Sequence, residues 1–297
     1  MERPDLLVVD LDGTLLNRQG EISQENLAAL HRAEQEGLPL IVATGRTASE
    51  CRPILKEIKG TKAFIGASGS LLTHLATEQT IDRRVMAPTL VQQVLETCPL
   101  EDAAIMLLKD HHQTGVDYIV VGDADLHPVS QWWFEVTGAS WHRISRIEDD
   151  PHPEHTVRAG AVGTPCQLDP MVERIDEAMG KAVLARHWEA VTSSSHAGTK
   201  IHLLEVFHPE ADKWTMIQSW CAHANIACER TAAVGDGLND VMMIERSRLG
   251  IAMANADHRV LAVADAVTGD HEDHGVAELI EDLLDGRLHL GMSEQVQ

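Results

Sequence analysis

The chain has 297 residues, 44% of them hydrophobic, and a formal net charge of −22 at pH 7. This length allows a large core and two domains, and the acidic balance argues against nucleic acid or an anionic membrane surface as a partner, because both select basic patches. The five cysteines form no CxxC pair, and we see neither a signal-peptide pattern nor an apolar run near the roughly 20 residues of a membrane span, so we expect a soluble, cytoplasmic protein.

The first part of the chain alternates predicted strands and helices. Residues 6–10 are apolar on both faces, as in a central strand of a covered parallel sheet. Ser23 can cap a helix that Gly37 ends. A second buried strand, "LPLIVATGR", leads to Thr44, a helix follows around 47–58, and "AFIGASG" forms a third short strand. This rhythm predicts a doubly wound, mostly parallel α/β sheet.

The middle of the chain has a different pattern. From about 85 to 196, strand-like pieces such as "AAIMLL" and "TVRAGAVG" alternate with helical pieces near 89–97 and 167–179, which predicts an inserted α+β domain. The first rhythm then returns with "IHLLEVF", a helix over about 212–224, and the strands "TAAVGD" and "LGIAMANA".

These patterns define the expected domains. We expect a core formed by residues 1–83 plus 197–285, an inserted domain over 84–196, and a loose polar tail over 286–297.

Polar side chains stand where the predicted core strands end. In a doubly wound sheet, ligands bind beyond the carboxyl ends of the strands, so these residues are candidates for one site. They are Asp10 with Asp12, Thr44 with Arg46, Lys213 at the start of a helix, and Asp236 with Asn239 and Asp240.

The acids of this set predict a metal site. Carboxylates packed so closely would repel one another, and a hard divalent cation such as Mg²⁺ removes the conflict. We expect Asp10 and Asp236 as side-chain ligands and the Asp12 carbonyl as a third. Asn239 and Asp240 would then orient waters or brace the ligands.

The same residues can carry out phosphoryl transfer. Asp10 keeps an oxygen free to attack an electrophile, and Asp12, in the turn that follows, can be the general acid and base. Thr44 can hydrogen-bond a phosphoryl oxygen, and Lys213 can neutralise the charge that develops there. The sequence therefore predicts chemistry through an aspartyl-phosphate.

Further residues are candidates for contact with phosphate or substrate. The turn after Asp12 offers backbone N–H groups, whereas Arg46 can either form a structural ion pair or contact the substrate. The candidates are Gly13, Thr14, Gly45, Arg46, Ser68 and Gly69.

The motifs "DLDGTLL", "VATGR", Lys213 and "VGDGLND" resemble, in order and spacing, the four motifs of the haloacid dehalogenase-like hydrolases. The insert resembles the large α/β cap (type IIB) of the Cof-type subfamily, as do "GIAMANA" and "VTGDHEDHGVAELI". The resemblance implies that Asp10 is the nucleophile and a Mg²⁺ ligand, Asp12 the acid and base, Thr44 a phosphate contact, Lys213 the motif lysine, and Asp236 with Asp240 the metal-binding motif.

The chain departs from this family pattern at two places. Ser68 and Gly69 stand where Cof-type proteins usually have Asn-Gly, which predicts altered substrate contacts. Trp214 follows Lys213 where a glycine is usual, which bears on the surroundings of that lysine.

We therefore expect a Mg²⁺-dependent phosphatase acting on small phosphorylated metabolites such as sugar phosphates, nucleotides or phosphorylated cofactors, a substrate class implied by the resemblance. Two alternatives remain open at this point. One is a phosphotransferase or phosphomutase with the same nucleophile, and the other is a non-catalytic sensor of a phosphorylated ligand.

Overall fold

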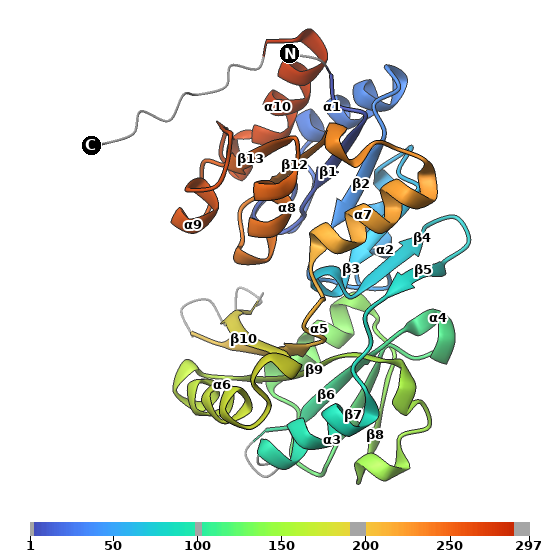
Figure 1. Ribbon diagram of the computed structural model, residues 1–297, viewed down its shortest axis with the longest axis vertical. Helices are drawn as coiled ribbons and strands as arrows, with labels where there is room; N and C mark the ends of the chain where they lie inside the picture. Colours follow the sequence, from blue (N-terminus) through green and yellow to red (C-terminus); the bar gives the residue numbers. More distant parts are fainter. Residues whose placement is uncertain (1–2, 99–102, 191–199, 288–297) are drawn as a thin grey trace. The chain divides into compact units, whose positions relative to one another are not determined.

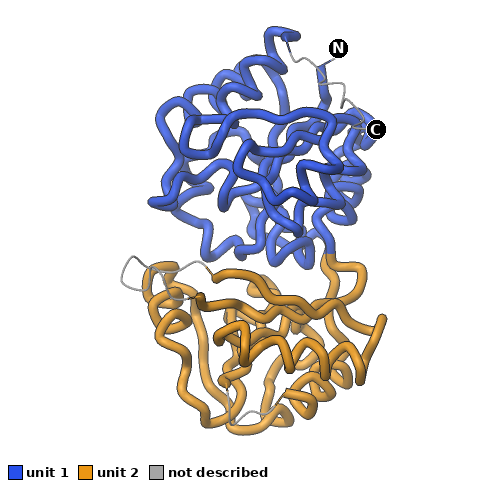
Figure 2. Tube along the Cα trace, turned by 90° about the vertical axis from the view of Figure 1, so that its left-hand side faces the viewer, with its two compact units in different colours: residues 1–82, 212–297 blue, residues 83–211 orange. Residues whose placement is uncertain are grey.

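The computed structural model describes residues 3–98, 103–190 and 200–287 of the chain. The chain forms two compact units, drawn in different colours in Figure 2: unit 1 comprises residues 1–82 and 212–297, and unit 2 comprises residues 83–211. Within the described ranges, we find no helix with the length and apolar character needed to cross a membrane.

Unit 1 is built on an eight-stranded sheet in the order β14-β13-β12-β1-β2-β3-β4-β5. Its strands are β1 (Leu6–Val9), β2 (Leu40–Ala43), β3 (Ala63–Gly66), β4 (Leu71–His74), β5 (Gln79–Arg83), β12 (Thr231–Gly235), β13 (Leu249–Met253) and β14 (Ala266–Thr268). The pairs from β14 through to β3 are parallel, and β4 pairs antiparallel with β3. The predicted doubly wound, mostly parallel sheet is therefore present.

Helices cover both faces of this sheet, as Figure 1 shows. They are α1 (Gln24–Gln35), α2 (Arg52–Glu57), α7 (Lys213–Ala224), α8 (Val241–Arg246), α9 (His258–Leu261) and α10 (Gly275–Asp285). Because successive side chains of a strand point to opposite faces, β1 contributes to two cores. Val9 packs in a cluster with Leu30 of α1 and Leu279 of α10, and Val8 packs in another with Met216 of α7 and Ile244 of α8.

Local signals in the sequence explain where the helices begin. The Ser23 side chain accepts a hydrogen bond from the backbone N–H of Asn26 at 3.2 Å, which caps α1 as predicted. Asp212 caps α7 in the same way, by accepting from the backbone N–H of Thr215 at 2.9 Å. The cap fixes Lys213 as the first residue of α7.

Unit 2 has a six-stranded sheet in the order β10-β11-β9-β6-β7-β8. Its strands and helices are β6 (Ile105–Lys109), β7 (Tyr118–Val121), β8 (Trp141–Ile144), β9 (Thr156–Gly163), β10 (Leu184–Glu189), β11 (His202–Phe207), α3 (Pro88–Thr97), α4 (His111–Thr114), α5 (Pro128–Thr137) and α6 (Pro165–Met179). The sheet is antiparallel except between β7 and β8, and side chains of α3 and α6 share its apolar core. The predicted inserted α+β domain is therefore present.

The strand β11 corrects the predicted boundary of the inserted domain. We expected residues 197 onward in the core, but β11 pairs antiparallel with both β9 and β10 and buries Leu204 and Val206 in the core of unit 2. Unit 2 accordingly extends to residue 211. An apolar strand does not specify the sheet it joins, so the sequence pattern alone could not place this boundary.

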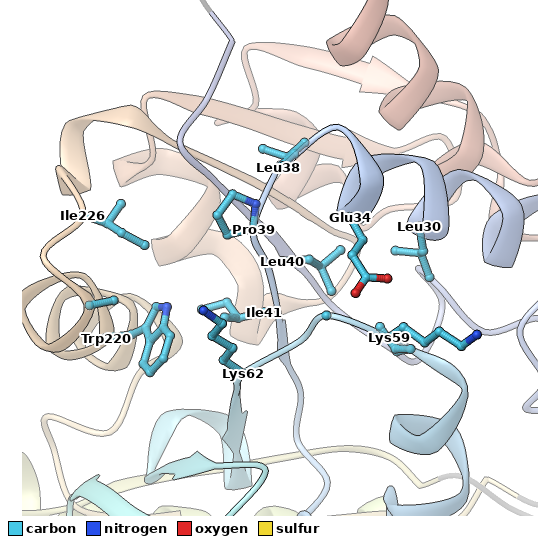
Figure 3. Close-up of a pocket in the computed structure, with 14 residues that line it drawn as sticks. Leu30, Glu34, Leu38, Pro39, Leu40, Ile41, Lys59, Lys62, Trp220 and Ile226 are labelled. Carbon is cyan, nitrogen blue, oxygen red and sulfur yellow. The ribbon is translucent and has the colours of Figure 1, made fainter.

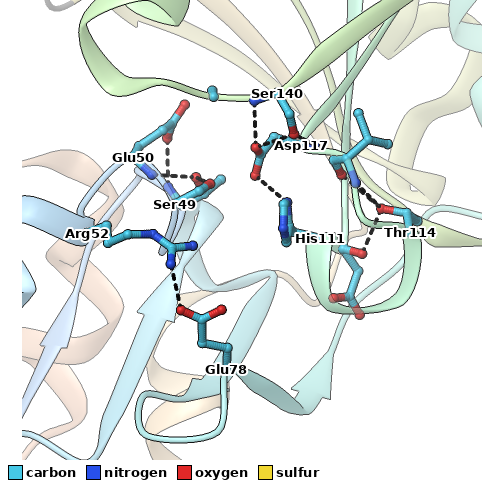
Figure 4. Close-up of polar contacts among 12 residues, drawn as sticks. Ser49, Glu50, Arg52, Glu78, His111, Thr114, Asp117 and Ser140 are labelled. Atoms are coloured by element: carbon cyan, nitrogen blue, oxygen red, sulfur yellow. Dashed lines mark hydrogen bonds and ion pairs between the residues drawn. The ribbon is translucent and has the colours of Figure 1, made fainter.

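Polar contacts hold the loops of unit 2. The Asp117 carboxylate, shown in Figure 4, accepts hydrogen bonds from the backbone N–H and the hydroxyl of Ser140, each at 2.8 Å, and lies 3.0 Å from Nδ1 of His111. These contacts join the start of β7 to the residues that precede β8.

Among the described residues of unit 2, Lys109 at the end of β6 has the most deeply buried charge. Its side chain is fully buried, and its ammonium donates to Asp150 Oδ2 at 2.5 Å, to Thr156 Oγ1 at 2.6 Å and to the His152 carbonyl at 3.1 Å. Burial lowers the pKa of Lys109, and the hydrogen bond with Asp150 opposes that shift. The lysine thus ties the loop of residues 150–156 to the sheet.

We predict that Lys109→Ala destabilises unit 2 by about 3 kcal/mol, because it leaves the buried Asp150 carboxylate without its charge partner. Chemical denaturation followed by circular dichroism measures the change, with the exposed Lys181→Met as a matched control. The double variant Lys109→Met, Asp150→Leu should recover most of the loss, since an apolar pair replaces the ion pair. A single variant as stable as the control would contradict this role.

Candidate active site

The candidate residues come together beyond the carboxyl ends of the central strands of the unit 1 sheet. Strands β12, β1 and β2 are adjacent and parallel, so their carboxyl ends lie side by side. Asp10 follows β1, Thr44 follows β2 and Asp236 follows β12. Asp10 is only 5% exposed and Thr44 1%, so these polar groups need partners or a ligand.

Lys213 lies between two of the carboxylates. Its ammonium donates to Asp10 Oδ1 at 2.6 Å and to Asp240 Oδ1 at 2.5 Å, and its side chain is fully buried. Burial by itself lowers the pKa of Lys213, but the charges of Asp10 and Asp240 outweigh it, so the pKa is raised overall. The lysine is therefore a fixed cation in the centre of the site.

Gly69 allows the helix that carries Lys213 to approach. Gly69 has φ +93°, and a Cβ there would lie 2.1 Å from the carbonyl carbon of Asp212 and 2.5 Å from the backbone nitrogen of Lys213. Trp214, the departure noted after the motif lysine, is buried in the apolar cluster under α7. The tryptophan thus packs on the sheet and does not displace the ammonium.

Asp240 braces the loop that holds Asp236. Its Oδ2 accepts hydrogen bonds from the backbone N–H groups of Asp236 at 3.1 Å and Gly237 at 2.9 Å, while Oδ1 binds Lys213. Asp240 is fully buried. Both of its oxygens are thus engaged, which supports the bracing role expected for this residue.

The turn after β1 is joined to the same loop. The Thr14 hydroxyl donates to Asp236 Oδ1 at 2.8 Å. Gly13 has φ +77°, and a Cβ there would lie only 2.3 Å from Asp236 Oδ2, so this position has room for glycine alone. Asn255 donates from Nδ2 to the Gly13 carbonyl at 2.8 Å and accepts at Oδ1 from the backbone N–H of His271 at 3.1 Å. Asn255 is not among the site residues predicted from the sequence, in which its only signal is its position in "GIAMANA".

Arg46 forms an ion pair with Asp12. Its Nε lies 2.8 Å from Asp12 Oδ2, and its Nη2 binds Oδ1 of the same carboxylate. Burial lowers the pKa of Arg46, but the charge of Asp12 raises it overall. Of the two roles left open for Arg46, the structure shows the ion pair.

The chain turns directly after Arg46. The backbone N–H of Thr47 donates to Oε2 of Glu50 at 2.7 Å, and Figure 4 shows the Glu50 side chain.

Ser68 occupies an unusual position. It has φ +54°, in the left-handed region that asparagine and glycine tolerate better than serine does, and its Oγ is buried with no hydrogen-bond partner among the described residues. A Cβ on Gly45 would lie 3.4 Å from Ser68 Oγ and 3.9 Å from Asn239 Nδ2. Thr44 Oγ1 accepts a 3.3 Å hydrogen bond from the backbone N–H of Arg46. The candidates for phosphate or substrate contact are thus gathered beside the acidic residues.

The acidic cluster fits a divalent cation. One carboxylate oxygen from each of Asp10, Asp236 and Asp240 lies within 4.8 Å of the others. Burial and the charge of Asp240 raise the pKa of Asp10 well above its ordinary value, and the same two causes raise the pKa of Asp236 to about 7. Asp10 and Asp236 thus resist ionisation even beside Lys213, and an all-oxygen set of this kind suits a hard cation such as Mg²⁺.

The chain is similar to known proteins along most of its length. The family model described as haloacid dehalogenase-like hydrolase matches residues 7–280. "Phosphatase YwpJ" of Bacillus subtilis is 27% identical over 302 residues, covering 94% of this chain and 99% of that protein. "5-amino-6-(5-phospho-D-ribitylamino)uracil phosphatase YcsE" of the same organism is 26% identical over 280 residues, with 93% and 94% covered.

The fold is also similar to that of a solved structure. "HAD Subclass IIB Sugar Phosphatase BT4131" has a TM-score of 0.74 and 19% identity, with 96% of this chain and 100% of that chain covered. The core sheet and inserted domain predicted from sequence are those of this fold, and the resemblance to the haloacid dehalogenase-like hydrolases is confirmed.

The raised pKa values predict a pH dependence of stability without metal. A carboxyl whose pKa is higher in the folded state binds its proton more tightly there, so it stabilises the fold at low pH. For Asp236 this contribution is lost between the ordinary value of 3.8 and about 7, and Asp10 acts in the same direction. In EDTA, the melting temperature should therefore fall as pH rises from about 4 to about 7.

Scanning calorimetry with and without Mg²⁺ measures this slope. Because the cation binds the ionised carboxylates, Mg²⁺ should flatten it, as should Asp236→Asn, whereas the exposed Asp5→Asn should keep it. A slope that Mg²⁺ and Asp236→Asn leave unchanged would refute the assignment.

Proposed function

The chain belongs to the haloacid dehalogenase-like hydrolase family of enzymes, and on that premise we propose that it is a phosphatase that hydrolyses small phosphomonoesters through an aspartyl-phosphate on Asp10. The observation that carries this proposal is the asymmetric binding of the Asp10 carboxylate. Lys213 holds Oδ1 at 2.6 Å, whereas Oδ2 accepts no hydrogen bond from a described residue. One oxygen is fixed by a cation, and the other keeps its lone pairs for attack.

In the first half of the reaction, Asp10 Oδ2 attacks phosphorus and the P–O bond to the leaving alcohol breaks. Asp12, two residues along the turn, protonates the leaving oxygen. In the second half, Asp12 takes a proton from water, which attacks the phosphorus of the aspartyl-phosphate and releases phosphate. The Arg46 guanidinium binds both oxygens of the Asp12 carboxylate and so fixes its orientation. One of these two bonds must open for Asp12 to carry the proton.

Neighbouring groups can stabilise the transferring phosphoryl oxygens. Lys213 supplies a fixed positive charge, and the hydroxyls of Thr44 and Ser68 stand at the ends of the adjacent strands β2 and β3. Hydrogen-bond donors already held in place need little rearrangement as charge develops on those oxygens. The buried Ser68 hydroxyl supports this role, because it bonds to no described residue.

Asp10 and Asp236 would hold a Mg²⁺ ion, with the Asp12 carbonyl as the third protein ligand and Asp240 and Asn239 as supporting groups. When bound, the ion acts as a Lewis acid that neutralises charge on a phosphoryl oxygen. The closeness of the three carboxylates supports this assignment.

The substrate class follows from the relatives and from the charge of the chain. Relatives are named as phosphatases of a phosphorylated ribitylaminouracil, of pyridoxal phosphate and of phosphoglycolate, and others are named only as phosphatases. A surface with a net charge of −22 repels polyanions, which favours small phosphorylated metabolites over nucleic acids. The five cysteines form no disulfide, which supports a reducing compartment such as the cytoplasm.

Conversion of the nucleophile and of the proton carrier to amides tests the mechanism. Asp10→Asn should abolish phosphate release from para-nitrophenyl phosphate, and Asp12→Asn should lower kcat by about 10²–10⁴-fold. Asp5→Asn, at the opposite end of β1, is the matched control and should keep full activity. Rapid-quench mass spectrometry should find phosphate on Asp10. An active Asp10→Asn variant, or an adduct elsewhere, would overturn the mechanism.

Turnover in ¹⁸O water separates hydrolysis from the alternatives. A phosphatase incorporates one ¹⁸O atom into each phosphate it releases. A phosphotransferase passes the group to an alcohol or sugar without the label, and a sensor binds phosphate esters without turnover. Labelled phosphate released from several esters is the expected result.

The backbone at Ser68 gives a second prediction. Ser68→Gly should raise the free energy of unfolding by at most about 1 kcal/mol, because it removes a side chain held at positive φ. The same change should raise KM for the ester, because a hydroxyl donor is lost. Ser70→Gly is the control, since Ser70 is equally buried and has an ordinary φ of −86°, and it should destabilise the protein. An unchanged KM in Ser68→Gly would exclude the substrate contact.

A further inference from the structure

Unit 1 contains a cavity of about 370 Å³ at the amino ends of the strands, opposite the acidic cluster at their carboxyl ends. It is lined by residues at the start of β2 and in the loop that leads into β3, whereas Thr44 follows the other end of β2. Figure 3 shows these side chains around the opening. A cavity of this size falls within the range that small-molecule sites occupy.

The walls of the cavity are mainly apolar. Leu30 of α1, Leu38 and Leu40 around the start of β2, and Ile58 beyond α2 line it, and Trp220 and Ile226 close it from the side of α7. Such a surface favours a ligand with an apolar body, because contact removes both surfaces from water.

One buried hydrogen-bond donor in the wall is unsatisfied. The indole of Trp220 is 5% exposed, and no acceptor among the described residues reaches its Nε1. His223 stacks on the ring at 5.5 Å between centroids, which fixes its orientation. Burying a donor without an acceptor costs free energy, so an acceptor from a ligand would be favoured at this position.

The opening of the cavity is more positive than the chain as a whole. Lys59 and Lys62 line it against a single acid, Glu34, although acids exceed bases by 22 over the whole sequence. Neither lysine forms an ion pair or hydrogen bond with a residue in the described part of the chain. In Figure 3, Lys62 lies toward the same end of the cavity as Trp220, and Lys59 and Glu34 lie toward the other.

We propose that this cavity binds a small organic carboxylate with an aliphatic body, at a site separate from the phosphoryl-transfer centre. The carboxylate accepts a hydrogen bond from Trp220 Nε1 and pairs with the ammonium of Lys62. The aliphatic part lies against Leu38, Leu40 and Ile226. An anion is favoured over a cation because both of the groups at that end of the cavity, the indole N–H and the ammonium, are donors.

Three probes of equal chain length test the proposal: octanoate, octan-1-ol and octylammonium. Nuclear magnetic resonance of the intact protein with ¹⁵N-labelled tryptophan follows the indole N–H signals, and Trp220→Phe identifies the signal of Trp220. Octanoate should move that signal in a saturable manner. The alcohol should bind more weakly, and the ammonium probe should bind weakest of the three.

Two lysine variants give the matched comparison. Lys62→Met should weaken octanoate binding by roughly two- to fivefold, the range expected for one partly exposed ion pair, and bring its affinity close to that of octan-1-ol. Lys56→Met, on the exposed side of α2, should leave the affinity unchanged. Neither residue belongs to the phosphoryl-transfer centre, so both variants should keep their turnover of phosphate esters.

Three results would overturn the proposal. These are an indole signal of Trp220 that does not respond to octanoate, equal binding of all three probes, and equal weakening by Lys62→Met and Lys56→Met. Circular dichroism of each variant confirms folding. The result is independent of whether the enzyme is a phosphatase, because no step of it requires turnover.

Discussion

The Lys213 ammonium between Asp10 and Asp240 is the interaction on which the candidate active site depends. Two buried carboxylates this close would repel each other, and the shared cation offsets that repulsion. The helix that carries the lysine reaches this position only because Asp212 caps α7 and Gly69 leaves room for it. Asp240 in turn holds the loop of Asp236 through two backbone N–H groups, so one ion triad positions the ends of two strands and one helix.

The sequence predicted the position of these groups well because parallel topology imposes it. Once β1, β2 and β12 are identified as buried parallel strands, the residues after their carboxyl ends must lie together, and Asp10, Thr44 and Asp236 do so. Lys213 was identifiable from its place at a helix start. The predicted boundary was wrong at β11, because a short apolar run does not specify which of the two sheets it joins.

The details of the site depend on contacts between residues far apart in the chain, which no local pattern encodes. Arg46 and Asp12 are 34 positions apart, and their pairing follows from the neighbouring strands β1 and β2. Asn255 binds Gly13 across 242 positions. The positive φ of Ser68 follows from the turn after β3, where a serine stands at a position that asparagine would occupy with less strain. The residue types thus identify the candidate site residues, whereas the tertiary fold determines which residues they contact.

The same parallel topology explains how one sheet can offer two unlike sites. Three clustered carboxylates lie beyond the carboxyl ends of the strands, where we propose a cation. Beyond the amino ends lie two lysines and the buried indole of Trp220, which are hydrogen-bond donors. Two elements extend from the amino ends of the strands to their carboxyl ends. Strand β2 begins beside the cavity and ends before Thr44, and α7 begins at Lys213 and carries Trp220 about 10 Å further along its axis. A ligand in the proposed site would therefore touch the elements that carry Thr44 and Lys213, which makes turnover a necessary control for every cavity variant.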